Sequence, residues 1–251
     1  MVEELVDRVC CRGGSVLVIR DCVACKGCFL LQYLLIKLLM ETNIRVVMLG
    51  LVEPFSHYAR IARKQGCSLQ SMRDNGRFVF LEQSQLLTLQ GNGTDDEANV
   101  TSFSDNPLAA VYLKVREAAR GNVVVDPAVD GGQKTCIMID DASVLDIIAG
   151  GDHNFVLDFL QYCRALTVKK QRCSVVLLTH QDVYEESPVS SMNLALEYAA
   201  DTVLTVEPLS TGLAVDVHGQ VTILHRTVQM EIQPSQLKAV DEQELYFDPV
   251  K

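Results

Sequence analysis

Short runs of β-branched and other apolar residues alternate with helical patterns through the first four-fifths of the chain. Strands that alternate with helices are typical of right-handed crossovers and a mostly parallel sheet, so the pattern predicts an α/β fold with helices flanking a central sheet. The expected strands are SVLVIR at 15–20, RVVMLGL at 45–51, RFVFL at 77–81, CIMID at 136–140, SVVLLTH at 174–180 and TVLTV at 202–206. The expected helices lie near 27–41, 57–65, 107–120, 153–166 and 193–200.

Particular residues mark the expected ends of several helices. Ser56 is expected to cap the helix that follows it, and Gly66 is placed to end that helix. Asn106 precedes a proline at a first helical position, and Gly121 follows the last turn of the same pattern. Asp152 can cap the helix after it, because its carboxylate accepts backbone N–H groups of the first turn.

After residue 206 the alternation of strand and helix patterns gives way to successive strand patterns. TGLAVDVHGQVTILHR at 211–226 predicts two strands with a turn near 218–219, and a last strand is expected at 244–248. The end of the chain is therefore expected to extend the sheet with antiparallel strands. Polar stretches at 88–106 and 126–134 predict loops. With no internal repeat and no Pro-rich linker, residues 1–251 are predicted to form one domain.

Composition narrows the class of protein. Of the 251 residues, 48% are hydrophobic and 22% are charged, which is ordinary for a globular protein and argues against general disorder. The net charge of −10 disfavours tight, unassisted nucleic-acid binding, because phosphate contacts need clustered Lys and Arg. Any such role is expected to need a local basic patch or basic partner chains.

Two further features bear on location. The first residues are acidic and amphipathic, unlike a secretory signal, and the longest apolar stretch, 27–40, is too short to span a bilayer and contains Lys37. Nine cysteines in an unexported chain suggest reduced thiols, many of them filling the core. We therefore expect an intracellular protein that does not enter a membrane.

The segment DCVACKGC at 21–28 lies where phosphate-binding α/β domains place their glycine-rich loop, between a first strand and a helix. The pattern G-x-x-x-x-G-K-[ST] needs glycines to wrap the anion, a Lys to neutralise it and a hydroxyl for Mg²⁺. Here only Gly27 remains, and Cys28 and Phe29 follow it. Asp21 places negative charge where the first glycine belongs. Efficient nucleotide hydrolysis through this loop is therefore not expected.

The spacing of Cys22, Cys25 and Cys28 is also consistent with a metal site. Three thiolates can bind zinc or an iron–sulfur cluster, but a closed site needs a fourth ligand, which Cys10, Cys11 or a histidine could supply only by folding nearby. No second C-x-x-C pairs with the first. We favour thiols that fill a collapsed phosphate loop and predict no metal, with the metal site as the alternative.

Polar residues at the ends of two other strands complete a possible degenerate nucleotide site. Asp140 ends the strand CIMID, where nucleotide-binding domains hold the water of Mg²⁺, and His180 ends the next core strand. Both have a simpler interpretation, since strands often end in a polar capping group. Glu53, after the second strand, is equally consistent with a water-activating acid or a loop residue. Gly27, Asp140 and His180 are our candidate cofactor-binding residues.

The order of these elements resembles the RecA core. More narrowly, the chain is similar to the Elongator complex protein 6 family, RecA-like accessory subunits of the Elongator tRNA-modifying complex. Members of this family keep the P-loop fold with a degraded nucleotide motif. The pieces that carry the resemblance are FSHYARIARKQGCSL at 55–69, GRFVFLE at 76–82, IDDASVLD at 139–146, VLDFLQYCRA at 156–165 and TGLAVDVHGQVTIL at 211–224.

The resemblance implies a function. Such a subunit is expected to be non-catalytic and to form a heterohexameric ring with Elongator complex proteins 4 and 5, alongside the catalytic Elongator subunits, in the cytoplasm and nucleus. The ring binds tRNA and supports carboxymethyl-type modification of wobble uridine. Any ATP hydrolysis belongs to the assembled ring, so this chain is expected to be a pseudo-ATPase with no cofactor of its own beyond weak ATP binding at ring interfaces.

Two basic clusters are candidates for RNA contact. Arg60, Arg63 and Lys64 share the helix after FSHY, and the second cluster precedes the strand SVVLLTH. For each, a solvated helix face or turn is the simpler interpretation. The second cluster consists of Lys169, Lys170 and Arg172.

Three other functions remain open at this point. An active RecA-like ATPase requires the lysine and hydroxyl that the loop lacks. A cysteine-based metal or redox protein requires Cys22, Cys25 and Cys28 to act as thiolates. A pure scaffold requires no tRNA contact at all.

Overall fold

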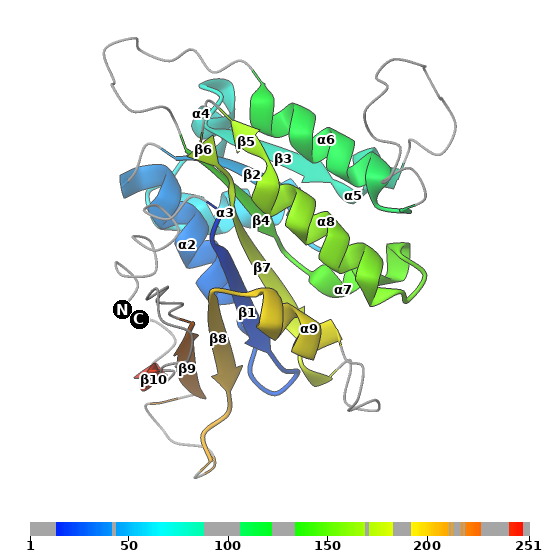
Figure 1. Cartoon of the computed structure of the whole chain (residues 1–251). Coiled ribbons are helices and arrows are strands. Elements are labelled where there is room, and N and C mark those ends of the chain that lie inside the picture. The colour runs from blue at the N-terminus through cyan, green and yellow to red at the C-terminus, as the bar shows by residue number, and fades with distance from the viewer. Residues whose placement is uncertain are drawn as a thin grey trace, which may run out of the picture.

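The computed structural model describes residues 14–41, 44–87, 106–121, 134–168, 171–182, 192–210, 212, 217, 219–226 and 241–247. Its centre is an eight-stranded sheet in the order β10-β9-β8-β1-β7-β4-β2-β3 (Figure 1). The strands are β1 Val16–Asp21, β2 Arg45–Gly50, β3 Phe78–Glu82, β4 Thr135–Ile139, β7 Ser174–His180, β8 Thr202–Glu207, β9 Gly219–His225 and β10 Asp241–Phe247.

The pairing within the sheet confirms the predicted fold class. Strands β8, β1, β7, β4, β2 and β3 are parallel to one another, whereas β9 pairs antiparallel with β8 and β10 pairs antiparallel with β9. The chain therefore has a RecA-like α/β fold with an antiparallel C-terminal extension. Because β7 lies between β1 and β4, the acid after β4 is one strand removed from the loop after β1.

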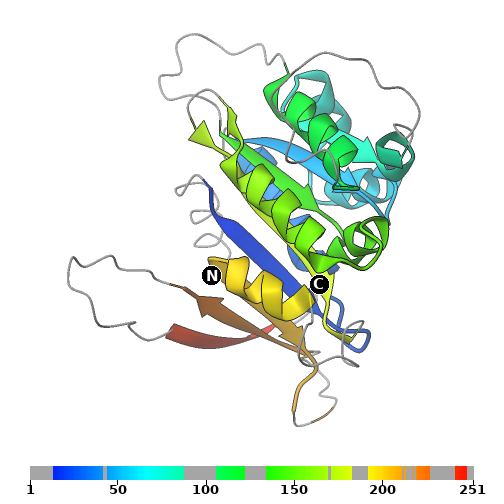
Figure 2. The same ribbon diagram turned by 45° about the vertical axis from the view of Figure 1, so that its right-hand side comes forward.

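Helices cover both faces of the sheet (Figures 1 and 2). Apolar residues of α2, α3 and α4 pack on one face, and those of α5 to α9 pack on the other. The helices are α2 Cys28–Glu41, α3 Phe55–Lys64, α4 Leu69–Asp74, α5 Gln83–Leu87, α6 Ala109–Arg120, α7 Ala142–Ile148, α8 His153–Ala165 and α9 Met192–Ala199.

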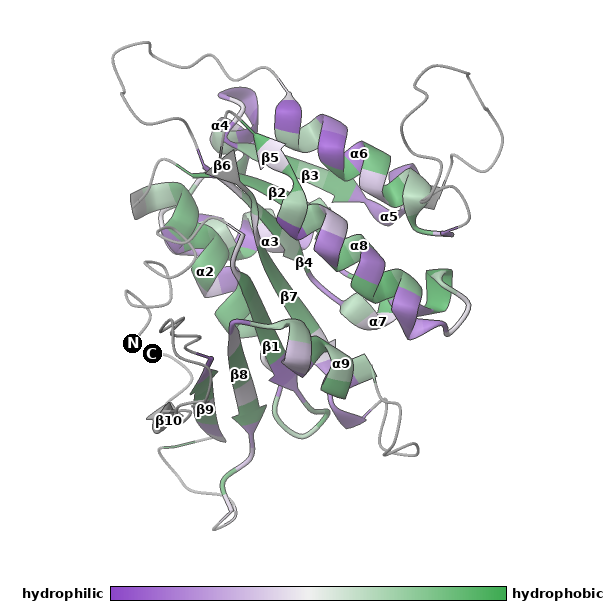
Figure 3. Ribbon diagram, in the orientation of Figure 1, coloured by the Kyte–Doolittle hydropathy of each residue, from purple (hydrophilic) through white to green (hydrophobic). Residues whose placement is uncertain are grey.

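Alternation along β1 explains why the sheet has two cores. Leu17 and Ile19 point into the layer under α2 to α4, and Val16 and Val18 point into the layer under α6 to α9. A parallel strand buried on both faces needs apolar residues at every position, and Figure 3 shows the central strands as hydrophobic along most of their length. Helices α6 and α8 carry most of their polar residues on the outward side, whereas α2 is apolar over most of its surface.

The predicted helix ends are partly confirmed. Asp152 caps α8, accepting a hydrogen bond from the Asn154 N–H at 3.0 Å. Gly66 follows α3 with a φ of 80°, which a glycine adopts without strain. The prediction for Ser56 is wrong, because α3 begins at Phe55 directly after Pro54, whose fixed φ already suits the residue before a helix.

The second capped helix begins later than expected. The Asn106 side chain accepts a hydrogen bond from the Leu108 N–H at 2.8 Å, but α6 itself starts at Ala109 and ends at Arg120, with Gly121 as its C-cap. Asn106 therefore shapes the turn that leads into the helix, and it is not the helix cap. Its amide also donates to the Phe155 carbonyl at 3.1 Å, which ties the start of α6 to α8.

Several short elements were not predicted. Helices α4, α5 and α7 have seven residues or fewer, and the hairpin of β5 Thr167–Val168 with β6 Gln171–Arg172 has two-residue strands. Such elements are too short to show a periodic pattern. Residues 88–105 and 126–133 of the predicted loops and most of the predicted strand before β9 lie outside the described residues. No helix in the described parts combines the length and apolar character needed to cross a membrane.

The two assignments of a capping residue can be separated by substitution. Asp152→Ala removes a bond to a helix N-terminus and is expected to lower the free energy of unfolding by about 1 kcal/mol. Ser56→Ala is expected to change it by less than about 0.5 kcal/mol, because Ser56 is an exposed residue within the first turn of α3. Urea unfolding of both variants measures the difference, and equal losses would contradict the observed start of α3.

Candidate functional site

Polar residues gather at the edge of the sheet where β1, β7 and β4 end. In the parallel register, Asp21 at the end of β1 stands opposite His180 at the end of β7. Asp140 and Asp141 follow β4 directly. This carboxyl edge is where open α/β sheets bind their ligands, so it is the place to look for a nucleotide site.

The loop after β1 is folded tightly onto the sheet. The backbone groups of Cys22 and Cys25 bond each other at 3.4 and 3.1 Å, which closes a turn whose tip, Val23, is 81% exposed. Gly27 is buried, and a Cβ there would lie 3.1 Å from both Asp21 Cβ and Ile19 Cγ2. The loop therefore leaves Gly27 packed against β1 where an open phosphate loop would surround an anion.

A buried carboxylate of the protein occupies the position expected for an anion. Asp21 is 1% exposed, and its Oδ2 accepts a hydrogen bond from the Gly27 N–H at 2.6 Å. Its Oδ1 lies 2.5 Å from His180 Nδ1. The N–H at the head of α2, which a phosphate would use, is bound to the chain's own acid.

His180 lies between two carboxylates. Its Nε2 is 3.4 Å from Asp141 Oδ2, so the imidazole joins β1 to the residue after β4. Hydrogen bonds to Asp141 and Asp21 outweigh its partial burial and raise the pKa of His180 from 6.5 to about 10. Burial alone would raise the pKa of Asp141, but hydrogen bonds from His180 and Ser143 lower it. At neutral pH the group is a cation held by two anions.

Asp140 is turned toward a different part of the molecule. Its carboxylate accepts hydrogen bonds from the N–H groups of Leu51, Val52 and Glu53 at 2.8, 3.3 and 3.2 Å, and from Tyr58 Oη at 3.2 Å. Burial raises the pKa of Asp140, and these donors counteract the rise. The residue thus holds the connection between β2 and α3.

Glu53, the possible water-activating acid, also contacts another side chain of the protein. Glu53 Oε2 lies 3.3 Å from His57 Nδ1, and His57 Nε2 lies 3.1 Å from the Gln32 amide of α2. These contacts link α2, α3 and the end of β2. Of the predicted nucleotide-site residues, Gly27 and His180 are joined through Asp21, whereas Asp140 bonds to neither of them in the described network.

Burial affects two of the three cysteines of the loop. Cys22, Cys25 and Cys28 are thiols that form no disulfide bond, and α2 begins at Cys28 as expected. Burial is the main cause that raises the pKa of both Cys25 and Cys28, so their thiols stay protonated at neutral pH. Among the described side chains, no three of the types His, Cys, Asp and Glu are grouped for a metal ion.

The structure describes one of the two predicted RNA-contact clusters in full and little of the other. Arg60, Arg63 and Lys64 are all exposed on α3. Lys169 and Lys170 lie outside the described residues. Arg172 belongs to β6, but its side chain lies outside the description.

Comparison with known proteins gives the family. The model of the family described as Elongation complex protein 6 matches residues 5–242. The chain belongs to this family. Three relatives named Elongator complex protein 6 support the assignment. They come from Rattus norvegicus (32% identity), Xenopus laevis (34%) and Homo sapiens (31%); each alignment covers 80% of this chain and 75–76% of the relative.

In this member of the Elongation complex protein 6 family, sequence reasoning missed the central residue of the site. From the sequence, Asp21 is treated only as a negative charge in the loop, and Asp141 is not among the candidate residues. The available signal was an acid at the end of one core strand and a histidine at the end of another. Recognising it requires knowing that β1 and β7 are adjacent, although Asp21 and His180 are 159 residues apart.

The network of Asp21 and His180 can be tested by a double-mutant cycle. Asp21→Asn leaves a protonated imidazole with one anion fewer in a buried site, and we expect it to lower the free energy of unfolding by about 3 kcal/mol. His180→Gln should cost less in the Asp21→Asn background than in wild type, with a coupling energy of at least about 1 kcal/mol. Additive losses in urea unfolding would show that the two side chains act independently.

The same network predicts a pH dependence. Because the pKa of His180 is about 10 in the folded protein and 6.5 without its partners, its contribution to stability is complete below about pH 6.5 and is lost as the pH rises through about 10. The stability difference between wild type and His180→Gln should therefore shrink across this interval. Urea unfolding at several pH values measures it, and a difference that grows with pH would contradict the network.

Asp140 gives a separate prediction. Asp140→Ala leaves backbone N–H groups of Leu51, Val52 and Glu53 without their acceptor, and we expect a loss of about 3 kcal/mol in the free energy of unfolding. Asp158→Ala, at a position on α8 away from this network, is the control and should change it by less than about 0.5 kcal/mol. A stable Asp140→Ala variant would contradict this role and return Asp140 to consideration as a nucleotide ligand.

Proposed function

We propose that this chain is a non-hydrolysing, RecA-like subunit of the Elongator complex. In this proposal it assembles with Elongator complex proteins 4 and 5 into a heterohexameric ring that binds tRNA and supports carboxymethyl-type modification of wobble uridine. Support for membership of the complex comes from the family match and from the names of the curated relatives.

The observation that carries the non-hydrolysing role is the Asp21 carboxylate bound to Gly27 N–H. A triphosphate at this loop would have to displace a buried acid that is also paired with His180. It would then face Asp21 and Asp141 without the lysine that neutralises phosphate in active P-loops. The residues present therefore do not fit a bound ATP and magnesium ion, and we derive no hydrolytic step through this chain.

Exposed apolar residues at the carboxyl edge support assembly with a partner. Val23 follows β1, Val52 follows β2, and Ile147 belongs to α7 after β4; they are 81%, 58% and 76% exposed. Such residues beside one edge of a sheet are typical of a protein–protein interface. In this proposal the edge that binds nucleotide in related folds serves as a contact surface.

The alternative functions have less support. An active ATPase is disfavoured by the occupied loop, and a thiol-based redox protein is disfavoured by the raised pKa values of Cys25 and Cys28. A scaffold without RNA contact differs from our proposal only in the role of the basic face of α3. The two functions are distinguished by whether RNA binding by the assembled complex depends on these basic residues.

Assembly and nucleotide binding can be measured together. Co-expressed with Elongator complex proteins 4 and 5, the chain should purify with both at equal stoichiometry, while the chain alone should show no ATP binding by calorimetry at millimolar nucleotide. Ile147→Asp together with Val23→Asp should weaken assembly at least tenfold, because charges are placed in an apolar contact.

Met40→Asp is the matched control, since Met40 is 51% exposed at the opposite end of α2 from the loop. A monodisperse monomer that ignores both partners would refute the assembly. Tight ATP binding by the isolated chain would refute the non-hydrolysing role.

A further inference from the structure

A surface hollow of 370 Å³ lies between α3 and α4. Its size falls within the range of sites for small organic groups, about 300–1,000 Å³. Phe55 and Leu69 contribute apolar surface to it, and Arg60, Arg63, Ser56 and Gln70 contribute polar groups. Two helices therefore shape a depression that combines an apolar floor with a polar rim.

The charge of this hollow suits an anion. Arg60 and Arg63 are three residues apart on α3, so their guanidinium groups emerge on the same side of the helix. The described lining contains these two cations and no carboxylate. The nearby Asp74 accepts a hydrogen bond from the Gln70 amide at 2.9 Å. Paired guanidinium groups are the side chains best suited to the oxygens of a phosphate.

The floor suits a flat ring. Phe55 is half-buried, and its ring is held by Phe78 and Phe80 at centroid distances of 6.3 and 5.6 Å. The guanidinium carbon of Arg73 lies over the same ring, 5.5 Å from its centroid, so a base would contact the part of the Phe55 ring that Arg73 leaves exposed. An aromatic ring fixed beside two arginines is the combination with which proteins bind a base and its phosphate in single-stranded nucleic acid.

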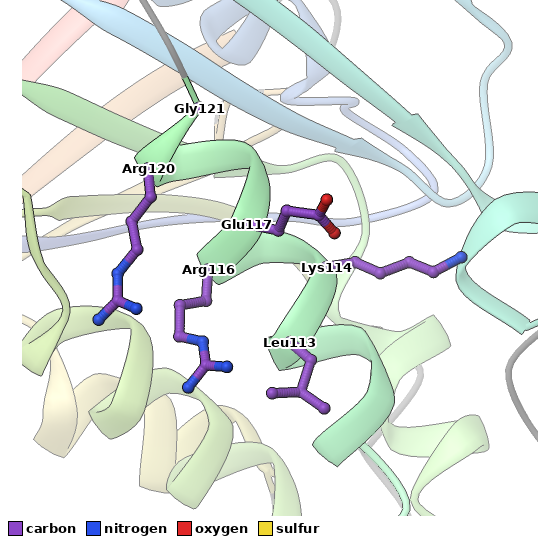
Figure 4. Close-up of a pocket in the computed structure, with 6 residues that line it drawn as sticks. All are labelled: Leu113, Lys114, Arg116, Glu117, Arg120 and Gly121. Atoms are coloured by element: carbon purple, nitrogen blue, oxygen red, sulfur yellow. The ribbon is translucent and has the colours of Figure 1, made fainter. Parts of the chain in front are cut away.

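A second hollow offers a comparison. Its volume is 610 Å³, and its described lining comes from α6 and the glycine that follows (Figure 4). Arg116 and Arg120 point to one side there, but Glu117 adds a carboxylate and no aromatic ring belongs to the described lining. Because α6 packs on the other face of the sheet from α3, its arginines provide a matched control.

We propose that the hollow between α3 and α4 binds one nucleotide of a single-stranded RNA, with the phosphate on Arg60 and Arg63 and the base against Phe55. The inference rests on the proposed function, which makes RNA a ligand of the assembled complex. It adds the position and chemistry of one contact on this chain. Lys64, next to Arg63, contributes long-range attraction at the rim.

The test uses the complex assembled from the full chain and its two partners, with a fluorescent single-stranded RNA oligonucleotide whose anisotropy is followed over a salt series. Arg60→Glu with Arg63→Glu should weaken binding at least tenfold and make the slope of log affinity against log salt shallower by about 0.7, because the contact with one phosphate is lost. Arg60→Lys with Arg63→Lys should retain most of the slope. Arg116→Glu with Arg120→Glu should leave affinity within about twofold.

Photocrosslinking gives an independent readout of the base. RNA carrying 4-thiouridine should crosslink to the peptide that contains Phe55 in wild type, and this crosslink should be lost in the Arg60→Glu, Arg63→Glu complex. Folding of each variant is checked by its thermal unfolding midpoint, which should stay within about 2 °C of wild type because the changed residues lie on the surface.

Several outcomes would overturn the inference. Unchanged RNA affinity in the α3 variant, or equal losses in the α3 and α6 variants, would show that this hollow is not a site. Displacement of RNA by poly-glutamate with the same dependence on Arg60 and Arg63, and with tighter binding, would make it a surface for an acidic protein segment.

Failure of the proposed function has a different signature. If the wild-type complex assembles but binds no RNA, the tRNA role and this inference fall together. If it binds RNA independently of Arg60 and Arg63, only this inference falls.

Discussion

The contact on which the structure of the carboxyl edge depends is the buried carboxylate of Asp21 between Gly27 N–H and His180. Burying an ionised acid is costly unless hydrogen bonds and an opposite charge compensate for the lost water. Here one oxygen takes the helix N–H and the other takes the imidazolium. The backbone follows from this, because Gly27 can donate to Asp21 only when the loop lies against β1. Two more bonds reinforce the closure, from Gln181 N–H to the Asp21 carbonyl and from Val23 N–H to Asp182.

The two acids after β4, Asp140 and Asp141, stabilise different connections. Asp140 collects the N–H groups at the end of β2 and the hydroxyl of Tyr58, so it fixes where α3 begins. Asp141 faces the other way, where it caps α7 and bonds His180. Two adjacent carboxylates on a strand end point to opposite sides because side chains alternate along an extended backbone. As a result, the position that carries magnesium chemistry in related folds here carries the packing of two neighbouring connections.

Long elements could be predicted from the sequence because burial imposes a pattern on them. Strands β1, β4 and β7 are buried at nearly every position and carry apolar runs at their centres, and α8 has an apolar stripe along one side. Helices α4 and α7 escaped prediction, since six or seven residues give less than two turns of pattern. The start of α3 was misplaced because two plausible signals lay two residues apart, and the backbone restriction of Pro54 outweighed the capping tendency of Ser56.

A candidate site could be predicted from the sequence when its residues lie close together along the chain, and not when they come from distant elements. The shared face of Arg60 and Arg63 follows from helical spacing alone, whereas the hollow beside them also needs α4, which no pattern announced. The bond between Asp21 and His180 needs the pairing of β1 with β7. That pairing depends on the order of strands in the sheet, which the sequence does not show. The sequence alone shows only that the loop lacks the lysine after its last glycine, which is weaker evidence against nucleotide hydrolysis than the buried Asp21.

The position of His180 between two acids also constrains how this subunit can evolve. Replacing Asp21 with glycine would free the helix amide, but it would leave the loop without a lysine after Gly27 and the imidazolium with only Asp141 as a partner. A lysine at position 28 alone would leave the Asp21 carboxylate bound to Gly27 N–H. No single substitution therefore restores a phosphate-binding loop, because the acid has to be removed and a lysine has to be added after Gly27.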